Sequence, residues 1–286
     1  MTDVTPASGP AASGPATPQP AASRPPGPGR PIIEIRNLTK EFIADAAAGG
    51  STLALDSVDL SINPSEFISV IGPRGCGKTT LLRIVAGLIP YDSGEVLVSG
   101  KPVTGPGPDR AMVFQSFALL PWASVLENVA FGLETRGVGR KEREEMAQRL
   151  IKTVGLQGFE KRLPRHLSGG MQQRVGLARA LAVDPDVLLM DEPFGAIDEQ
   201  TRRIMQEELL RIWEYRRKTV MFVTHSMEEA VFLADRIVLM SPRPGRIQEI
   251  IDVPLPRPRG RDTERSREFT DVKEQLWDKL RVMQTV

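Results

Sequence analysis

Cysteine is nearly absent from this chain of 286 residues, and its single copy, Cys76, cannot form an internal disulfide or a paired-cysteine zinc site. Long apolar runs are missing too, because no stretch approaches the roughly 18 consecutive apolar residues that a membrane-spanning helix needs. Net charge is also small. The chain has 37 basic and 36 acidic residues, which leave +1 and give no general electrostatic case for binding nucleic acid. These absences favour a protein that folds in a reducing cytosol.

Bulky apolar residues are scarce in residues 1–30, which hold eight of the 24 prolines. Such a segment cannot bury enough surface to offset its conformational entropy, and it lacks the basic patch and apolar run of a secretory signal. We therefore expect a disordered Pro/Ala-rich extension over 1–30, a folded domain over 31–250, and a C-terminal tail with a terminal helix over 251–286.

Strand and helix patterns alternate through the rest of the chain. Before residue 72 the patterns predict an antiparallel set of strands, with Phe42 in a loop after the first of them. After residue 182 apolar strands alternate with helices, which predicts a doubly wound α/β core. Residues 116–182 predict a helical insertion between two strands of that core. The expected strands are 32–36, 53–55, 58–62, 66–71, 94–98, 111–114, 187–190, 219–224 and 236–240, and the expected helices are 80–86, 141–154, one from 169, 201–213, 227–234 and 268–283.

The stretch Gly72-Pro73-Arg74-Gly75-Cys76-Gly77-Lys78-Thr79 fits G-x-x-x-x-G-K-[ST], the phosphate-binding loop. Its glycines allow backbone N–H groups to turn inward around an anion, and the helix that follows directs its positive dipole end at the phosphates. Lys78 is expected to contact the β- and γ-phosphates, and the Thr79 hydroxyl to bind Mg²⁺. Cys76 is expected to be a small residue beside the phosphate and not a catalytic thiol.

Three further side chains follow apolar strands. Asp191 ends the strand 187–190 and is expected to hold Mg²⁺, while Glu192 is expected to polarise a water for attack on the γ-phosphate. His225 follows the strand 219–224, at the edge of an open α/β sheet where ligands bind, and is expected to contact the γ-phosphate. His166 has no such placement and is interpreted as a packing or surface residue.

The stretch Leu167-Ser168-Gly169-Gly170-Met171-Gln172-Gln173-Arg174 predicts a second anion site, since it offers an N-cap hydroxyl, open backbone N–H groups and a helix dipole. The loop at 72–79 already serves the nucleotide bound by this chain, so the second anion site is expected to serve the nucleotide of another subunit. This suggests a two-fold dimer, in which each copy completes the nucleotide site of the other.

These motifs, with Gln115 and the stretch Gly195-Ala196-Ile197-Asp198, resemble the ATP-binding-cassette (ABC) ATPase subunits of transporters over about residues 32–250. The resemblance implies an ABC-type P-loop ATPase fold with a RecA-like core, an antiparallel β subdomain and an inserted helical subdomain, and ATP and Mg²⁺ as cofactors. It also implies that Phe42 stacks on adenine, Gln115 contacts Mg²⁺ and senses a membrane partner, and Asp198 signals across a homodimer.

The resemblance thus assigns a full set of site residues. The catalytic residues are Glu192, His225, Lys78 and Gln115, and the metal-binding residues are Thr79, Gln115 and Asp191. The ATP-binding residues are Phe42, Gly72, Pro73, Arg74, Gly75, Cys76, Gly77, Lys78, Thr79 and Thr80, completed in trans by Ser168, Gly169, Gly170 and Met171.

Finer features are similar to the nitrate/sulfonate/taurine/bicarbonate importer subfamily. They are Leu119-Leu120-Pro121-Trp122, Val125-Leu126-Glu127-Asn128-Val129, Ser241-Pro242-Arg243-Pro244-Gly245-Arg246-Ile247 and Leu255-Pro256-Arg257-Pro258. The likeness implies integral membrane permease subunits, indirectly a solute-binding protein, and a peripheral place on the cytoplasmic face of the inner membrane. This chain departs from the family pattern at Arg74, Gly195 and Ile197.

Several alternatives stay open. A soluble ABC ATPase acting on nucleic acid or ribosomes would be expected to have two cassettes or a long coiled coil, and a sugar importer subunit a long regulatory domain after the cassette. The apolar residues Leu119, Leu120 and Trp122 could form a groove for a permease helix or simply pack. The run Arg257, Arg259 and Arg261 favours a solvated tail, with contact to phospholipid as the alternative.

Overall fold

A computed structural model describes residues 30–43, 50–195 and 198–284. The expected N-terminal disorder, most of the Ala/Gly insertion near residue 44, and Ile197 lie outside the described residues. Within them, no helix is long and apolar enough to cross a membrane.

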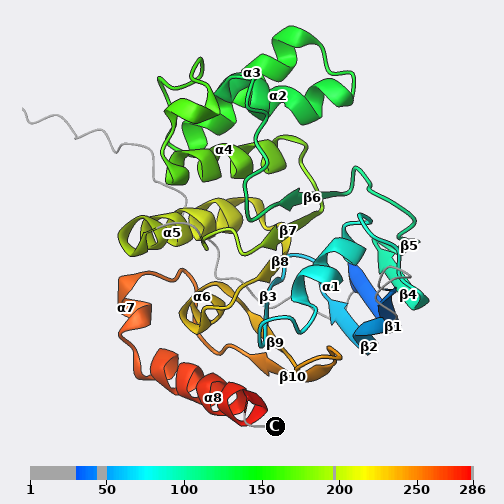
Figure 1. Cartoon of the computed structure of the whole chain (residues 1–286). Helices are drawn as coiled ribbons and strands as arrows, with labels where there is room; N and C mark the ends of the chain where they lie inside the picture. Colours follow the sequence, from blue (N-terminus) through cyan, green and yellow to red (C-terminus); the bar gives the residue numbers. More distant parts are fainter. Residues whose placement is uncertain (1–29, 44–49, 196–197, 285–286) are drawn as a thin grey trace, which may run out of the picture.

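Two β-sheets form the body of the molecule (Figure 1). The smaller sheet is antiparallel, with strand order β2-β1-β4-β5. The larger has the order β10-β9-β3-β8-β7-β6 and is parallel except for its edge strand β10. The bounds are β1 Ile33–Ile43, β2 Ser51–Ile62, β3 Phe67–Ile71, β4 Ser93–Val98, β5 Lys101–Pro102, β6 Arg110–Val113, β7 Val187–Asp191, β8 Thr219–Val223, β9 Arg236–Met240 and β10 Ile247–Asp252.

Helices cover the larger sheet and extend from it. They are α1 Lys78–Val85, α2 Val125–Thr135, α3 Arg140–Thr153, the short 3₁₀ helix η1 Pro164–His166, α4 Gly169–Ala182, α5 Glu199–Arg216, α6 Met227–Leu233, α7 Arg261–Glu264 and α8 Arg267–Gln284. Helices α2, α3 and α4 stand together between β6 and β7 in the chain, at the top of Figure 1. The predicted fold, an α/β core with an antiparallel β subdomain and a helical insertion, is confirmed.

The central strands explain how the layers hold together. All five residues of β3, β7 and β8 are buried, as expected for parallel strands covered on both faces. Because side chains alternate along a strand, Ile68 and Val70 enter the apolar cluster shared with α1 and the smaller sheet, whereas Phe67 and Ile71 enter the cluster on the α5 and α6 side. The larger sheet is therefore the middle layer of the molecule.

The prediction that Phe42 lies in a loop is wrong. Strand β1 continues to Ile43, and Phe42 pairs with Thr52 of β2. The two segments expected at 53–55 and 58–62 are one strand, because register irregularities opposite β1 absorb the break in their alternation.

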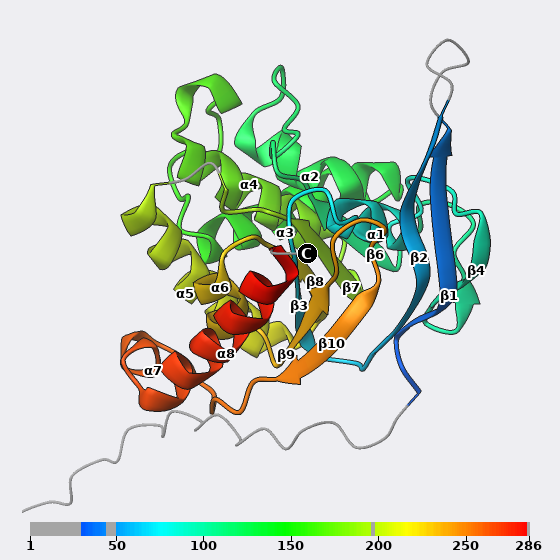
Figure 2. The same ribbon diagram turned by 60° about the horizontal axis from the view of Figure 1, so that its bottom comes forward.

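Both interpretations of Arg257 and Arg259 are also wrong, since these residues face neither solvent nor a membrane. The Arg257 side chain is 7% exposed and Arg259 is 6% exposed, because the chain after β10 packs against α6. Strand β10 crosses the boundary expected at residue 250, and α8 runs along the face that comes forward in Figure 2. The third arginine, Arg261, is exposed as predicted.

Candidate nucleotide-binding site

The phosphate loop joins β3 to α1 and requires glycine for two reasons. Gly75 and Gly77 have φ of 77° and 100°, in the left-handed region that other residues adopt only with strain. A Cβ on Gly77 would also lie 2.7 Å from Leu55 Cδ2 and 3.0 Å from the Ala54 carbonyl oxygen of β2. The loop is thus held closely against the antiparallel sheet.

Lys78 is the first residue of α1 and is only 7% exposed. Its ammonium group donates to the Gly72 carbonyl at 2.9 Å and the Pro73 carbonyl at 3.0 Å, so the side chain folds back over its own loop. This position brings a positive charge to a concave ring of backbone, an arrangement that binds phosphate.

The Cys76 side chain lies beneath the phosphate loop. It packs in an apolar cluster and is fully buried, and its Sγ is 3.8 Å from Lys78 Nζ. Burial raises the pKa of the Cys76 thiol, although nearby Lys78 opposes the effect. A thiol in that setting is inert.

A cavity of about 260 Å³ opens over the loop. It brings together Phe42 from β1, Gly75, Gly77 and the two cations of the loop, and Glu192 from the end of β7, whereas Gly72, Pro73 and Cys76 do not line it. Sequence reasoning missed three lining residues. Thr52 and Ala54 come from β2, and Arg243 comes from the turn after β9. The full lining is Phe42, Thr52, Ala54, Arg74, Gly75, Gly77, Lys78, Thr79, Thr80, Glu192 and Arg243.

Phe42 is one of the residues that line this cavity. Its side chain is 44% exposed, and Lys40 Nζ lies 5.3 Å from the ring centroid. A partly exposed ring beside a phosphate site has a free face on which a planar base can stack.

Two oxygen ligands meet where α1 begins and β7 ends. The Thr79 hydroxyl donates to Asp191 Oδ1 at 2.8 Å, and burial raises the pKa of Asp191. Within the described residues, no group of three or more histidine, cysteine or acidic side chains forms a closed metal cage. A hydroxyl and a carboxylate fit Mg²⁺, which keeps several waters and takes other oxygen ligands from substrate phosphates.

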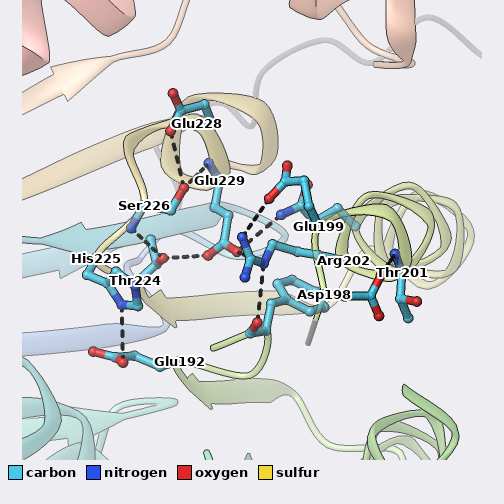
Figure 3. Close-up of polar contacts among 12 residues, drawn as sticks. Glu192, Asp198, Glu199, Thr201, Arg202, Thr224, His225, Ser226, Glu228 and Glu229 are labelled. Atoms are coloured by element: carbon cyan, nitrogen blue, oxygen red, sulfur yellow. Dashed lines mark hydrogen bonds and ion pairs between the residues drawn. The ribbon is translucent and has the colours of Figure 1, made fainter. Parts of the chain in front are cut away.

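Glu192, Gln115 and His225 converge from three neighbouring strand ends (Figure 3 shows the Glu192–His225 contact). Glu192 Oε2 lies 3.4 Å from Gln115 Nε2 and 3.3 Å from His225 Nδ1. The Glu192 backbone has φ 43°, a strained value for a residue with a side chain, and its N–H donates to the Val223 carbonyl of β8. The carboxylate is thus held at the cavity wall.

Behind His225 lies a buried carboxylate that sequence reasoning also missed (Figure 3). Glu229 accepts from the Thr224 hydroxyl, and Thr224 Oγ1 in turn accepts from Ser226 N–H at 3.0 Å, so both neighbours of His225 are tied down. Gln206 of α5 donates to Glu229 at 3.2 Å, and Arg202 lies 3.7 Å from it. Burial raises the pKa of Glu229 despite these partners.

The predicted second anion site does not line this cavity. Ser168 caps α4 by accepting from Met171 N–H at 3.3 Å, and a Cβ on Gly170 would lie 2.8 Å from Thr201 Cγ2 of α5. Asp198 caps α5 at the same place, since it accepts from Thr201 N–H at 3.0 Å, and these hydrogen bonds lower the pKa of Asp198. The signature stretch and Asp198 therefore sit beside each other, at the start of α5.

The other sequence-predicted residues are placed as follows. His166 is exposed and accepts from Arg165 Nε at 3.2 Å. Leu119 packs partly against the core, whereas Trp122 is 74% exposed. Packing thus accounts for Leu119, whereas the permease groove stays a prediction.

Comparison with known proteins decides the family. The family model described as ABC transporter matches residues 55–195. An uncharacterized ABC transporter ATP-binding protein of Methanocaldococcus jannaschii is 53% identical over 249 residues, which cover 87% of this chain and 91% of that protein. The chain belongs to the ABC transporter ATP-binding family. It is therefore an ATPase.

Two further relatives of this ABC ATPase are informative. The taurine import ATP-binding protein of Escherichia coli is 51% identical over 200 residues, or 70% of this chain and 78% of that protein. A dimeric ATP-binding cassette, solved in a post-hydrolysis state with ADP and Pi, matches with a TM-score of 0.69 and 32% identity, covering 80% of this chain and all of that one.

Proposed function

We propose that this chain is the ATP-hydrolysing subunit of an importer, in which two copies close around two Mg-ATP and drive solute uptake through permease subunits. One observation carries the proposal. Lys78, Thr79 and Glu192 line one cavity and Asp191 is hydrogen-bonded to Thr79, while Ser168–Gly170 lies outside the cavity. A second copy would supply the missing stretch, and the solved relative is itself dimeric.

The residues of the cavity would divide the work of hydrolysis. Lys78 and the loop amides hold the β- and γ-phosphates, and Phe42 stacks on adenine. Glu192 accepts a proton from the attacking water. At the same time the water oxygen bonds to the γ-phosphorus, and the bond from that phosphorus to the bridging oxygen breaks, giving ADP and phosphate. His225 holds the γ-phosphate. Thr79, Asp191 and Gln115 would hold Mg²⁺, which when bound supplies positive charge to the phosphate oxygens.

Solute and location are proposed from likeness. A taurine import protein among the relatives supports a small anionic solute of the nitrate, sulfonate or taurine type, with a solute-binding protein as indirect partner. We place the subunit at the cytoplasmic face of the inner membrane, where a permease holds it. Exposed Trp122, seven residues after Gln115, is a suitable contact for a helix of that permease.

The substitution Glu192→Gln tests whether Glu192 is the base for ATP hydrolysis in the proposed dimer. The substitution keeps shape and hydrogen bonding but removes the base, so we expect ATP binding and an ATP-dependent dimer to persist while steady-state phosphate release falls by roughly 10²-fold or more. Fluorescent-nucleotide binding, light scattering and phosphate release measure the three properties. Glu134→Gln, an exposed change in the helical insertion, is the matched control. Full turnover in Glu192→Gln would refute the assignment of the base.

Co-purification tests the importer. We expect the tagged chain to retain a hydrophobic membrane protein from a detergent extract, and Trp122→Ala to lower its recovery without changing nucleotide binding. Tyr215→Ala removes another exposed aromatic ring, 86% exposed, from α5 and is expected to have no effect. Recovery of RNA or ribosomes in place of a membrane protein would favour the soluble alternative.

A further inference from the structure

The turn between β9 and β10, residues 241–246, rests directly on the phosphate loop. Gly245 N–H donates to the Ala54 carbonyl at 2.9 Å, and Asp56 N–H donates to the Gly245 carbonyl at 3.0 Å, so the turn is fastened to β2. A Cβ on Gly245 would lie 2.0 Å from the Cys76 carbonyl oxygen. Only glycine allows this approach, and it brings the turn into contact with the loop backbone.

The turn is also braced by its own side chains. Ser241 Oγ donates to the Pro244 carbonyl at 3.1 Å and accepts from Arg246 N–H at 3.0 Å. The Arg246 guanidinium pairs with Asp56 of β2, and that hydrogen bonding lowers the pKa of Asp56. These contacts give the turn a defined shape, which fixes where Arg243 leaves it.

Arg243 reaches from this turn to the cavity. Its Nε donates to the Gly75 carbonyl at 3.3 Å, and its side chain lines the same cavity as Lys78 and Thr80. The side chain is exposed, and a guanidinium has five N–H donors in a planar fork. Such a group recognises phosphate oxygens through paired hydrogen bonds, which Lys78 as a point charge cannot do.

We propose that Arg243 is a second phosphate-binding cation of this site, contacting the polyphosphate of the bound nucleotide from the turn that rests on Gly75. The inference rests on the proposed nucleotide site. Two other roles are distinguishable from it. In the first, Arg243 only supports the loop through its hydrogen bond to the Gly75 carbonyl. In the second, its guanidinium packs against the base of the nucleotide.

Nucleotide titrations of the full-length chain test the proposal. Calorimetry with ATP and ADP, and ligand-detected NMR with adenosine, measure binding to the wild type and to Arg243→Ala, Arg243→Gln and Arg243→Lys. We expect Arg243→Ala to weaken ATP and ADP binding by roughly tenfold, as the loss of one charged hydrogen-bonding group does, and to leave adenosine binding unchanged. Arg243→Lys should recover part of the loss.

The variant Arg243→Gln distinguishes contact with the phosphates from support of the loop through the Gly75 carbonyl. Gln can still donate to the Gly75 carbonyl but carries no charge, so it should behave like Ala toward ATP while preserving the turn. Arg140→Ala, which removes an 82% exposed arginine from α3, controls for net charge. Unchanged ATP affinity in Arg243→Gln, or an equal loss of adenosine binding, overturns the proposal. Unchanged ATP affinity in Lys78→Ala would instead count against the nucleotide site itself.

Discussion

At the scale of single residues, Glu229 shows how a buried carboxyl group is retained next to His225, a residue of the proposed site. Burial disfavours the ionised carboxylate, whereas the Thr224 hydroxyl, Arg202 and His225 favour it. Burial is the larger effect, so the pKa of Glu229 is raised. The cost is tolerated where the same carboxylate fixes Thr224 and, through it, the segment that carries His225. Under the proposed function, Glu229 would act on the chemistry only through these neighbours.

Glu229 makes stability depend on pH in a definite direction. Because its folded pKa is raised, the folded state binds more protons than the unfolded state between the ordinary glutamate pKa and the folded value, and stability falls as pH rises through that window. Glu229→Gln does not titrate. We therefore expect the free energy of unfolding of Glu229→Gln, minus that of the wild type, to be larger at pH 8 than at pH 5.

Urea denaturation at the two pH values measures this difference. Glu228→Gln, on the exposed side of the same helix, is the matched control. A difference for Glu229→Gln that shrinks as pH rises would show that Arg202 and His225 outweigh burial.

Motif residues could be predicted from sequence because their local spacing already implies their chemistry. Lys78 follows β3, Asp191 is the last residue of β7 and His225 follows β8, and parallel strands place such residues at one edge of a sheet. Glu229 and Arg243 have no comparable local signal. Their roles depend on Gln206 and Gly75, residues that only the folded chain brings near them.

At the scale of elements, the segment after β10 is held by arginine and not by solvent. Arg259 donates to the carbonyls of Val231, Phe232 and Ala234 at the end of α6, at 3.1, 3.1 and 2.7 Å. Helix ends leave such carbonyls without helical partners, so a cation there is favourable. Burial lowers the pKa of Arg259 to about 9, which still leaves it charged at neutral pH.

Removing this cation should loosen the whole C-terminal segment. We expect Arg259→Ala to lower the free energy of unfolding by about 3 kcal/mol, since several buried carbonyls lose their donor. Arg261→Ala, two residues on and exposed, should change it by no more than about 0.5 kcal/mol. Chemical denaturation measures both. Equal effects of the two variants would mean that the buried contacts contribute nothing specific.

The solvated tail predicted for this segment from the sequence is wrong for a physical reason. Alternating arginine and proline carry no helical or strand period, and charged side chains usually face water, so the run looks like a solvated tail. Burial of Arg257 is decided by Trp213, whose ring lies 4.2 Å from the guanidinium carbon, and by Asp235. Both partners are distant in sequence.

At the scale of the whole molecule, the nucleotide cavity lies where the two sheets approach each other. Alternating strands and helices predict the layers of the larger sheet, because each layer follows from local periodicity. The fit between the sheets does not follow in that way. It depends on backbone approaches such as Gly77 to Ala54 and Gly245 to Cys76, which link segments of quite different position in the chain.

The location of Ser168–Gly170 outside the cavity has a consequence for heredity. Under the proposed pairing, each nucleotide site draws on two copies of the chain, so a defective chain that still dimerises would impair the pairs it forms with intact chains. With equal amounts of both, about a quarter of random pairs would contain two intact chains. An allele that encodes such a chain would be partly dominant, because the defective chain also impairs the intact chain with which it pairs.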